Sequence, residues 1–368
     1  MSLTWWATAA FGLEGQVRRE IEALGFSAQA ESGGVRFSGT AQDAFLANLW
    51  LRTADRVLLL MAEGKVTTYE ELFQLVRSIA WEKYLPRDAA FPVAAQCARS
   101  QLMSPRDCQA ITKKAMVERL KATYRTEWFQ ETGATYQVRV LLHNDVARIC
   151  LDSSGEALNR RGYRTWTGEA PLRETLAAAL VNLSPWRSGL PLYDPCCGTG
   201  TLLVEAAYLM ANRAPGLSRS FAMESWRMLD ASAARALREQ AQSQHRLEDI
   251  QGIAGSDIDP DALNLCKKHI KQASISNRIT VTQQDVYSLP ALQPGTVILT
   301  NPPYGERMGD RRQAERLYQR LYELHTATPD SRLCVFTAHA GFERVVGKKA
   351  ARKRRLYNGR LECGFLIY

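Results

Sequence analysis

Residues 300–307, TNPPYGER, place an amide, two consecutive prolines and a phenol at the end of an apolar run. The prolines must end the expected strand, because a proline ring fixes the backbone and removes an N–H donor. Asn301, Pro302 and Tyr304 therefore lie on a rigid corner. We expect this corner, with its carbonyl oxygens and its aromatic ring, to hold a ligand.

A second candidate site is the glycine turn in LPLYDPCCGTGTLLVEAAYLMA. A short strand ends in Asp194, Gly198 and Gly200 form the turn, and a helix is expected directly afterwards. Glycines let the backbone approach a ligand, and a helix N-terminus favours a negative group such as a carboxylate. No Gly-Lys-Ser/Thr follows, so this is not a P-loop, and Leu203 stands where a dinucleotide fingerprint has its third glycine. The stretch could also be nothing more than a turn.

Two acids follow the next two expected strands. The first, Asp257 in GIAGSDIDPDAL, stands where such sheets place an acid that binds ribose hydroxyls. This acid normally follows the glycine turn by about 20 residues. Asp257 follows Gly200 by 57 residues, so residues 213–250 are expected to form an insertion. The second acid, Asp285 in ITVTQQDVYSLP, could accept from the amine of an adenine while Val286 covers the ring.

The four elements occur in the order of a doubly wound α/β sheet. Each alone has an ordinary structural explanation, such as a helix cap or a core aromatic. Together they follow four successive expected strands, and ligands bind at the carboxyl ends of parallel strands in this architecture. The order therefore favours a nucleotide-like cofactor with a reaction site beside it.

These elements resemble the motifs of class I S-adenosylmethionine-dependent methyltransferases, and N-P-P-Y resembles the subgroup that methylates nitrogen conjugated to a ring or carbonyl. Nearly the whole chain resembles the THUMP-domain RNA methyltransferases that make N2-methylguanine, the bacterial 23S rRNA enzymes in particular. Four stretches carry this resemblance: ATAAFGLEGQVRREIEALGF, LNRRGYR before APLRETLAAAL, APGLSRSFAMESW and RRLYNGRLECGFLIY. Cys196 departs from the Phe or Met usual in the glycine turn.

The resemblance implies S-adenosylmethionine as cofactor and a role for each site residue. Asn301 and Pro302 would accept the N–H groups of the target amine, and Tyr304 would stack on the base. The cofactor-binding residues would be Asp194, Gly198, Gly200, Asp257, Ile258, Asp285 and Val286.

The basic residues indicate a polyanionic partner. The net charge is +9, which favours nucleic acid. Arg160, Arg161 and Arg164 form a first basic group, with Tyr163 and Trp166 among them. Basic residues mixed with aromatic ones suit the pairing of phosphates and the stacking of bases. The predicted RNA-binding residues are Arg160, Arg161, Arg164, Lys348, Lys349, Arg352, Lys353, Arg354 and Arg355.

Other classes of protein are disfavoured. No run of 18 apolar residues suggests a membrane span, and the N-terminus is a poor signal peptide. The eight cysteines include no C-x-x-C pair and the five histidines are scattered, so neither a metal site nor a disulfide framework is expected. We expect a cytoplasmic monomer.

The elements that must position these residues form three predicted domains. Residues 1–65 would be ferredoxin-like, residues 66–155 a THUMP domain, 156–170 a linker, and 171–368 the methyltransferase domain. The last would be a Rossmann-like, seven-stranded sheet closed by an antiparallel C-terminal hairpin, because Asn358-Gly359 is a strong hairpin-turn signal.

Several alternatives stay open. N-P-P-Y also occurs in DNA adenine methyltransferases and in enzymes that methylate glutamine in release factors. The substrate could be tRNA rather than 23S rRNA. The chain could also be an RNA-binding assembly factor that has lost catalysis.

Overall fold

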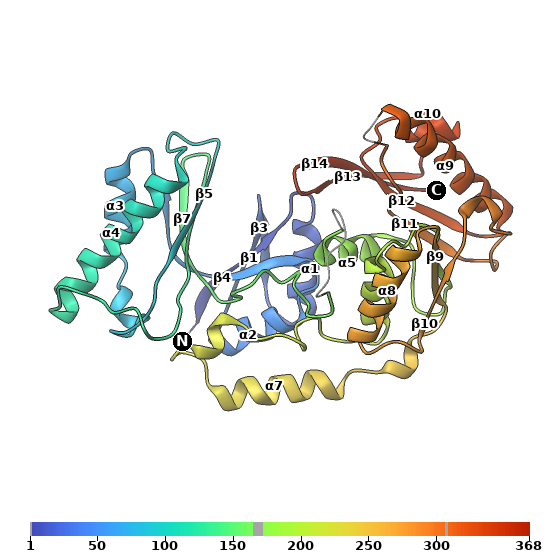
Figure 1. Cartoon of the computed structure of the whole chain (residues 1–368). Helices are drawn as coiled ribbons and strands as arrows, with labels where there is room; N and C mark the ends of the chain where they lie inside the picture. The colour runs from blue at the N-terminus through green and yellow to red at the C-terminus, as the bar shows by residue number, and fades with distance from the viewer. Residues whose placement is uncertain (1, 165–171, 306–307) are drawn as a thin grey trace. The chain divides into compact units, whose positions relative to one another are not determined.

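The computed structural model describes residues 2–164, 172–305 and 308–368 (Figure 1). The chain divides into two compact units, each discontinuous in sequence. The first comprises Met1–Ala9, Val17–Leu158 and Ser220–Gln240, and the second comprises Ala10–Gln16, Asn159–Arg219 and Ala241–Tyr368.

One mixed sheet runs through the first unit in the order β2-β3-β1-β4-β7-β6-β5. These strands are β1 (Leu3–Ala9), β2 (Ala28–Glu31), β3 (Gly34–Gly39), β4 (Ala54–Lys65), β5 (Val93–Ala98), β6 (Val138–His143) and β7 (Val146–Asp152). Strand β4 pairs antiparallel with β1 on one side and with β7 on the other. The sequence predicts a strand only over residues 57–61. Because β4 is longer, the predicted ferredoxin-like and THUMP parts share one continuous sheet.

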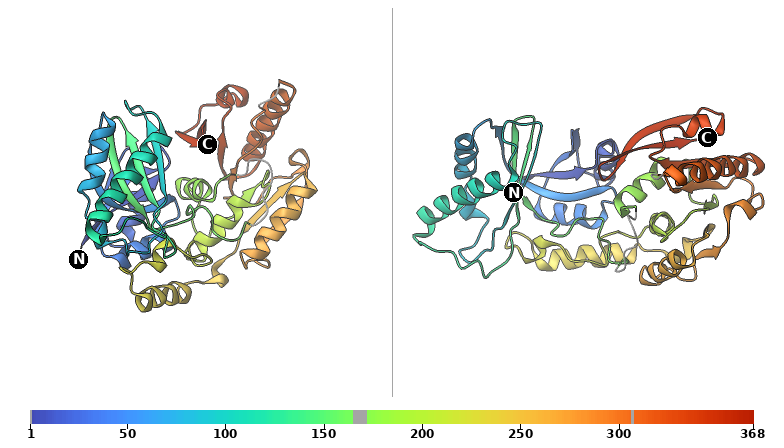
Figure 2. Two further views of the ribbon diagram at one scale, coloured as in Figure 1. Left: turned by 60° about the vertical axis from the view of Figure 1, so that its left-hand side comes forward. Right: turned by 45° about the horizontal axis from the view of Figure 1, so that its top comes forward.

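The helices of the first unit include three that begin at a Ser or Thr cap. They are α2 (Ala41–Trp50), α3 (Tyr69–Ser78) and α4 (Pro105–Tyr124), with the one-turn helices η1 (Trp81–Lys83) and η2 (Ala222–Ser225). The Ser104 side chain accepts from the Asp107 amide and Pro105 occupies the first turn of α4, as the sequence predicts. Helices α3 and α4 lie side by side next to β5 and β7 (Figures 1 and 2).

Two helices have residues in both units. Helix α1 (Glu14–Ala23) begins in the second unit and ends in the first, and α7 (Ala231–Ser243) does the reverse.

The expected insertion at 213–250 contributes its middle part to the first unit. Phe221 packs edge-on against Phe45, with 5.6 Å between ring centroids, and Trp226 stacks on Tyr136 at 5.0 Å. Such aromatic pairs stabilise a contact beyond the area that they bury. The insertion thus contributes buried side chains, Phe221 and Trp226, to the core of the first unit.

The second unit has the predicted Rossmann-like sheet, in the order β10-β9-β8-β11-β12-β14-β13. Its strands are β8 (Leu192–Asp194), β9 (Ile253–Asp257), β10 (Ile279–Gln283), β11 (Val297–Thr300), β12 (Arg332–Thr337), β13 (Arg352–Asn358) and β14 (Leu361–Ile367). The first five in that order are parallel, and β14 pairs antiparallel with both β12 and β13. The seven strands and the antiparallel C-terminal hairpin confirm the predicted fold class.

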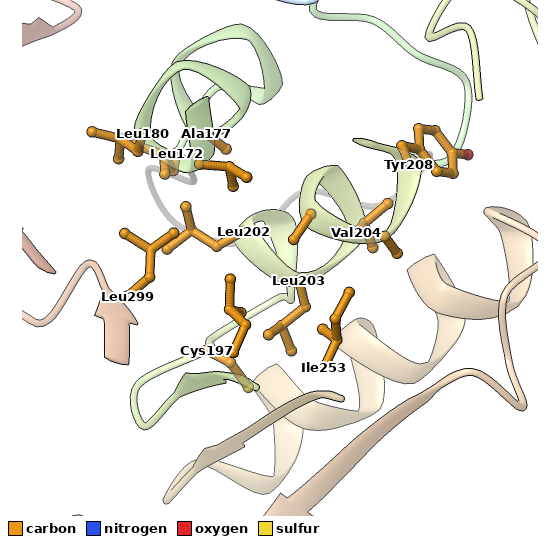
Figure 3. Packing of buried hydrophobic residues seen from close by; sticks show 14 of the residues in the cluster. Leu172, Ala177, Leu180, Cys197, Leu202, Leu203, Val204, Tyr208, Ile253 and Leu299 are labelled. Carbon is orange, nitrogen blue, oxygen red and sulfur yellow. The ribbon is translucent and has the colours of Figure 1, made fainter. Parts of the chain in front are cut away.

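Helices cover both faces of this sheet. They are α5 (Glu174–Leu183), α6 (Thr201–Met210), α8 (Pro260–Gln272), α9 (Met308–Ala327) and α10 (Phe342–Val346), with η3 (Leu247–Asp249) and η4 (Val286–Ser288). Along β11, Val297 and Leu299 belong to the core of one face and Ile298 to that of the other, as the two-residue period of a strand requires. Figure 3 shows Leu202, Leu203 and Val204 of α6 among the side chains of the first of these cores.

In the part of the chain that the structure describes, no helix is long and apolar enough to cross a bilayer. The eight cysteines all lie in that part as free thiols. Among the described residues, no group of three or more His, Cys, Asp or Glu side chains is placed to hold a metal ion.

Candidate active site

The predicted site residues gather at one edge of the second sheet. Strands β10, β9, β8 and β11 are parallel neighbours, so their carboxyl ends meet there. Asp194 and Asp257 are the last residues of β8 and β9. Asp285 follows β10 and Asn301 follows β11.

Side chains of β9 and α8 contact the backbone of the glycine turn. The Gly198 amide donates to Asp257 Oδ2 at 2.7 Å, and a ring nitrogen of His269 lies 3.0 Å from the Thr199 carbonyl. Gly200 has φ +82°, and a Cβ there would collide with Cys266 Sγ. The turn therefore needs glycine at position 200 for both its backbone angle and its packing.

Asp194 is a buried carboxylate at the bottom of the turn. Only 2% of the residue is exposed, and its Oδ1 accepts from the Cys196 amide at 3.1 Å. Burial raises the pKa of Asp194 from its ordinary 3.8 to about 7, and the charge of Asp257 also raises it. Its charge state consequently changes near neutral pH and responds to any cation placed beside it.

Asp257 has a structural role besides the predicted one. Its Oδ2 accepts from the Gly198 amide and its Oδ1 accepts from the Asp259 amide at 3.0 Å. Each carboxylate oxygen can accept a further hydrogen bond. Asp257 can therefore bind hydroxyls while it also orders the glycine turn.

Two pockets open on this edge and share Cys196. One, of about 610 Å³, is lined by residues from β9, the segment after β10 and α9, including Asp257, Ile258, Asp285 and Val286. The other, of about 460 Å³, is lined by Asp194, by the glycine turn and by Asn301 among others. Ile258 is 64% exposed and Val286 is buried, so the first pocket offers apolar surface beside two carboxylates.

The N-P-P-Y corner carries a hydrogen-bond arrangement that the sequence does not reveal. The Tyr304 hydroxyl donates to Asn301 Oδ1 at 2.7 Å. Burial raises the pKa of Tyr304 well above its ordinary value, so this hydroxyl keeps its proton. The Tyr304 ring packs against the core of the second unit. To stack on a base, as predicted, the ring would have to turn toward the substrate.

A buried tyrosine from α9 holds the same corner. The Tyr318 hydroxyl donates to the Pro303 carbonyl at 2.8 Å and lies 3.1 Å from Thr337 Oγ1. Thr337 Oγ1 accepts from the His339 amide at 3.0 Å, which leaves the threonine proton free to point at Tyr318. These hydrogen bonds form a chain in which each group donates to the next, from the His339 amide through Thr337 and Tyr318 to the Pro303 carbonyl.

The first basic group does not fit the RNA-binding role that we predicted for all of its members. Arg161 is 2% exposed and lies 3.5 Å from Glu205, whereas Arg164 pairs with Glu174 at 3.3 Å and donates to Thr201 Oγ1. These arginines have carboxylate partners inside the unit, and a phosphate has no access to Arg161. The prediction is wrong for Arg161, and Arg164 supports the wall of the smaller pocket.

The other residues of that group differ in their exposure to solvent. Arg160 is exposed, and Tyr163 is buried with its hydroxyl 3.0 Å from Glu205. Trp166 lies outside the described residues. The C-terminal group is exposed throughout, namely Lys348, Lys349, Arg352, Lys353, Arg354 and Arg355. Its role in RNA binding stays a prediction.

Sequence reasoning missed His269, Cys266 and Tyr318. All three lie on helical faces that also carry ordinary core residues, and none belongs to a recognisable motif. A polar residue in an otherwise apolar stripe was the available signal for His269 and Tyr318.

Models of three known families match this chain. An RMKL-like methyltransferase domain matches residues 161–366, an RlmL ferredoxin-like domain matches 4–58, and a THUMP domain matches 66–152. YpsC of Bacillus subtilis, provisionally named an RNA methyltransferase, is 38% identical over 98% of this chain and 94% of its own length. The chain belongs to the THUMP-containing, RlmL-like RNA methyltransferase family.

Other relatives extend the comparison. The ribosomal RNA large subunit methyltransferase K/L of Psychromonas ingrahamii is 33% identical over 98% of this chain, which spans only 49% of that protein. The solved structure of SMU.472, provisionally named a methyltransferase and bound to S-adenosylhomocysteine (SAH), is 35% identical with a TM-score of 0.94, over 100% of this chain and 98% of its own. A Listeria monocytogenes structure titled a predicted N6-adenine-specific DNA methylase is 39% identical with a TM-score of 0.93, over 100% and 96%.

The cofactor of this methyltransferase is S-adenosylmethionine, and the residues of the site fit it. The glycine turn leaves its backbone open, because a Cβ on Gly198 would meet no atom within 4 Å. Asp194 and Asp257 flank this turn, and the two pockets that meet at Cys196 extend along the strand ends. The site thus offers room for an elongated nucleoside with carboxylates along its length.

Proposed function

We propose that this enzyme methylates the exocyclic N2 amine of a guanine in RNA of the large ribosomal subunit. The observation that carries the proposal is the position of Asn301, which lines the same pocket as Asp194 and Gly198. The names of the K/L relatives support rRNA as the substrate. The N-P-P-Y corner supports an amine conjugated to a ring as the target.

When bound, the cofactor supplies a methyl group on a positively charged sulfur. Asp194 and the glycine turn would hold its methionine end, Asp257 its ribose, and Asp285 with Ile258 and Val286 its adenine. The buried carboxylate of Asp194 suits an ammonium group, and the exposed Ile258 side chain suits the face of a ring. These assignments are the predicted ones, and the grouping of the residues around two pockets that share Cys196 supports them.

The corner residues would act on the amine. Its lone pair is delocalised into the guanine ring, so it is a weak nucleophile until its direction is fixed. Asn301 Oδ1 and the Pro302 carbonyl would each accept one N–H and turn the lone pair toward the methyl group. Most of the rate gain would come from this positioning.

Tyr304 has a defined place in this proposal. In the structure its hydroxyl occupies the Asn301 oxygen that the substrate amine would need. We propose that the amine takes over this acceptor and that the released Tyr304 ring stacks on the flipped base. Removing a base from its helix costs a few kcal/mol, which stacking on an aromatic ring can offset.

The test is transfer of labelled methyl groups to total RNA from cells that lack this gene, followed by size separation. Label in the large rRNA supports the proposal. Label confined to tRNA would keep the chemistry but replace the substrate. No label in any RNA, with SAH still bound, would favour a protein substrate or a non-catalytic assembly factor.

The predicted domain boundaries, at residues 65, 155 and 170, are part of the proposal. So are a monomeric state and a cytoplasmic location. A second candidate is methylation of adenine N6 in DNA, which the name of the Listeria structure favours. The two RNA-type domains that precede the methyltransferase domain favour RNA instead.

A further inference from the structure

Two sequence motifs from opposite ends of the chain meet in the second unit. Phe11 belongs to the short segment Ala10–Gln16, and its ring packs edge-on against Tyr357 of β13, with 5.7 Å between centroids. The neighbouring Gly12 lies so close to β13 that a Cβ there would be 3.1 Å from the Arg355 carbonyl. The N-terminal segment therefore contacts β13, which is the edge strand of the second sheet.

The Phe11 ring is presented outward rather than buried. It is 55% exposed. Tyr357 is held behind it, because its hydroxyl donates to Glu362 Oε2 across the hairpin at 3.1 Å. A supported aromatic ring with one free side is the kind of surface on which a nucleobase stacks.

This aromatic pair, Phe11 and Tyr357, is close to the N-P-P-Y corner. Tyr304 packs against the core that includes Leu356 and Cys363, and it is in electrostatic contact with Asn358. These three residues lie on both strands at the tip of the hairpin that carries Tyr357. A nucleotide chain whose target base enters the corner would pass this tip.

The surroundings of the pair are strongly basic. Residues 348–362 contain seven Lys or Arg and a single acid, Glu362. Arg354 and Arg355 precede the tip and are exposed, and Arg360 in the turn is exposed as well. Lys353 is partly neutralised by an ion pair with Glu343 at 2.9 Å.

We propose that Phe11, supported by Tyr357, stacks an unpaired base next to the target nucleotide while Arg354 and Arg355 bind its phosphates. The inference rests on the proposed function and names its substrate more closely, as single-stranded RNA. Positive charge tracking the backbone beside an aromatic ring is the common design for binding single strands.

The test is binding of a short single-stranded RNA oligonucleotide and of a duplex of equal length. Stacking of a base on an aromatic ring is worth about 1–3 kcal/mol. Phe11→Ala should therefore weaken single-strand binding by about fivefold to a hundredfold, and Phe11→Trp should restore it. Binding of the duplex and of SAH should stay as in the wild type.

Salt dependence separates the two parts of the surface. Phe11→Ala should leave the slope of log K against log salt unchanged. The double variant Arg354→Ala with Arg355→Ala should reduce it by about 1.4, because each phosphate contact to a single strand contributes about 0.7. Leu190→Ala, an exposed apolar residue of the same unit, is the control and should bind as the wild type does.

The outcomes distinguish this inference from the proposed function. If wild-type enzyme methylates RNA and Phe11→Ala binds single strands as tightly, the inference is wrong and the function stands. An equal loss on single strands and duplex would also overturn it. If wild-type enzyme methylates no RNA, the proposed function itself fails. Since Phe11 is exposed, an unchanged melting temperature should accompany the loss.

Discussion

The charge of Asp194 depends on its surroundings. Its raised pKa of about 7 means that the ligand-free protein holds a proton there at pH 6. If Asp194 binds the ammonium group of the cofactor, that proton must leave on binding. Affinity for SAH should therefore fall by about tenfold between pH 8 and pH 6. Calorimetric titration measures this directly.

The raised pKa of Asp194 also determines how the stability of the fold changes with pH. A carboxyl whose folded pKa lies above its unfolded value stabilises the fold below about pH 4, and this contribution is lost as the pH rises through 7. Asp194→Asn should consequently melt at a higher temperature than the wild type at pH 8. Its SAH affinity should be weak and independent of pH. Wild-type binding that does not vary between pH 6 and pH 8 would contradict the assignment.

Asn301 is predicted to act on the methyl acceptor and not on the cofactor. Asn301→Ala should lower kcat by about 10²–10³, the usual effect of losing one such oriented group. SAH affinity should change by less than about twofold. Asn301→Asp keeps an acceptor oxygen and serves as the matched control, with part of the activity retained. Transfer at the wild-type rate by Asn301→Ala would remove the residue from the mechanism.

The site residues that the sequence predicted share one property. Asp194 and Asp257 end recognisable strands, and Asp285 and Asn301 follow such strands, so their order alone predicted that they lie at one edge. Arg161 could not be assigned in this way, because a basic residue in a connector looks the same whether its partner is a phosphate or a buried glutamate. Only the packing of Glu205 on α6 shows which it is.

This buried pair leads to a prediction about stability. Arg161→Ala would leave Glu205 as a charge without its arginine in the core, and losing one member of a buried pair costs about 3–5 kcal/mol. The melting temperature should therefore fall by several degrees. The control is Arg354→Ala, an exposed residue, which should melt as the wild type does but bind RNA with a smaller salt dependence. The reverse pattern would restore Arg161 as an RNA contact.

At the scale of elements, long periodic helices and alternating strands were predictable, and short or shared ones were not. Helix α4 begins at Pro105 as its cap predicts, and the C-terminal hairpin turns at Asn358-Gly359 as its turn residues require. Strand β2 was missed because AQAE has no apolar alternation. Strand β4 was predicted too short, since its exposed last residues gave no sign that β7 pairs with them.

Helix α9 carries Tyr318, whose hydroxyl leads to a testable prediction about catalysis. Burial raises the pKa of this tyrosine to about 12, so its hydroxyl remains a donor to the Pro303 carbonyl. Tyr318→Phe keeps the ring and removes the donor. We expect kcat to fall by about tenfold, with SAH affinity unchanged, because only the orientation of the corner is lost.

The control for this prediction lies one turn along the same helix. Tyr322 packs against Tyr368 and His325, away from the corner, so Tyr322→Phe should leave kcat unchanged. Thr337→Ser keeps the hydroxyl that donates to Tyr318 and should also retain activity. A Tyr318→Phe enzyme with wild-type kcat would show that the corner is rigid without this bond.

At the scale of the molecule, an RNA methyltransferase unit is joined to a unit that contains the ferredoxin-like and THUMP parts. Three segments of the chain form each unit, so the two are connected at several points and neither is a simple terminal extension. The chain has a net charge of +9, and residues 348–362 contain seven Lys or Arg and one acid. On the proposal above, this cluster gives the catalytic unit a part in RNA binding.

The central claim concerns the atom that receives the methyl group. The most direct measurement is nucleoside mass spectrometry of rRNA from cells lacking this gene, before and after treatment with the purified enzyme and its cofactor. We predict that one N2-methylguanosine appears in the large-subunit RNA and that Asn301→Ala enzyme does not produce it. Appearance of N6-methyladenosine, or of no new methylated nucleoside while DNA becomes methylated, would contradict the account.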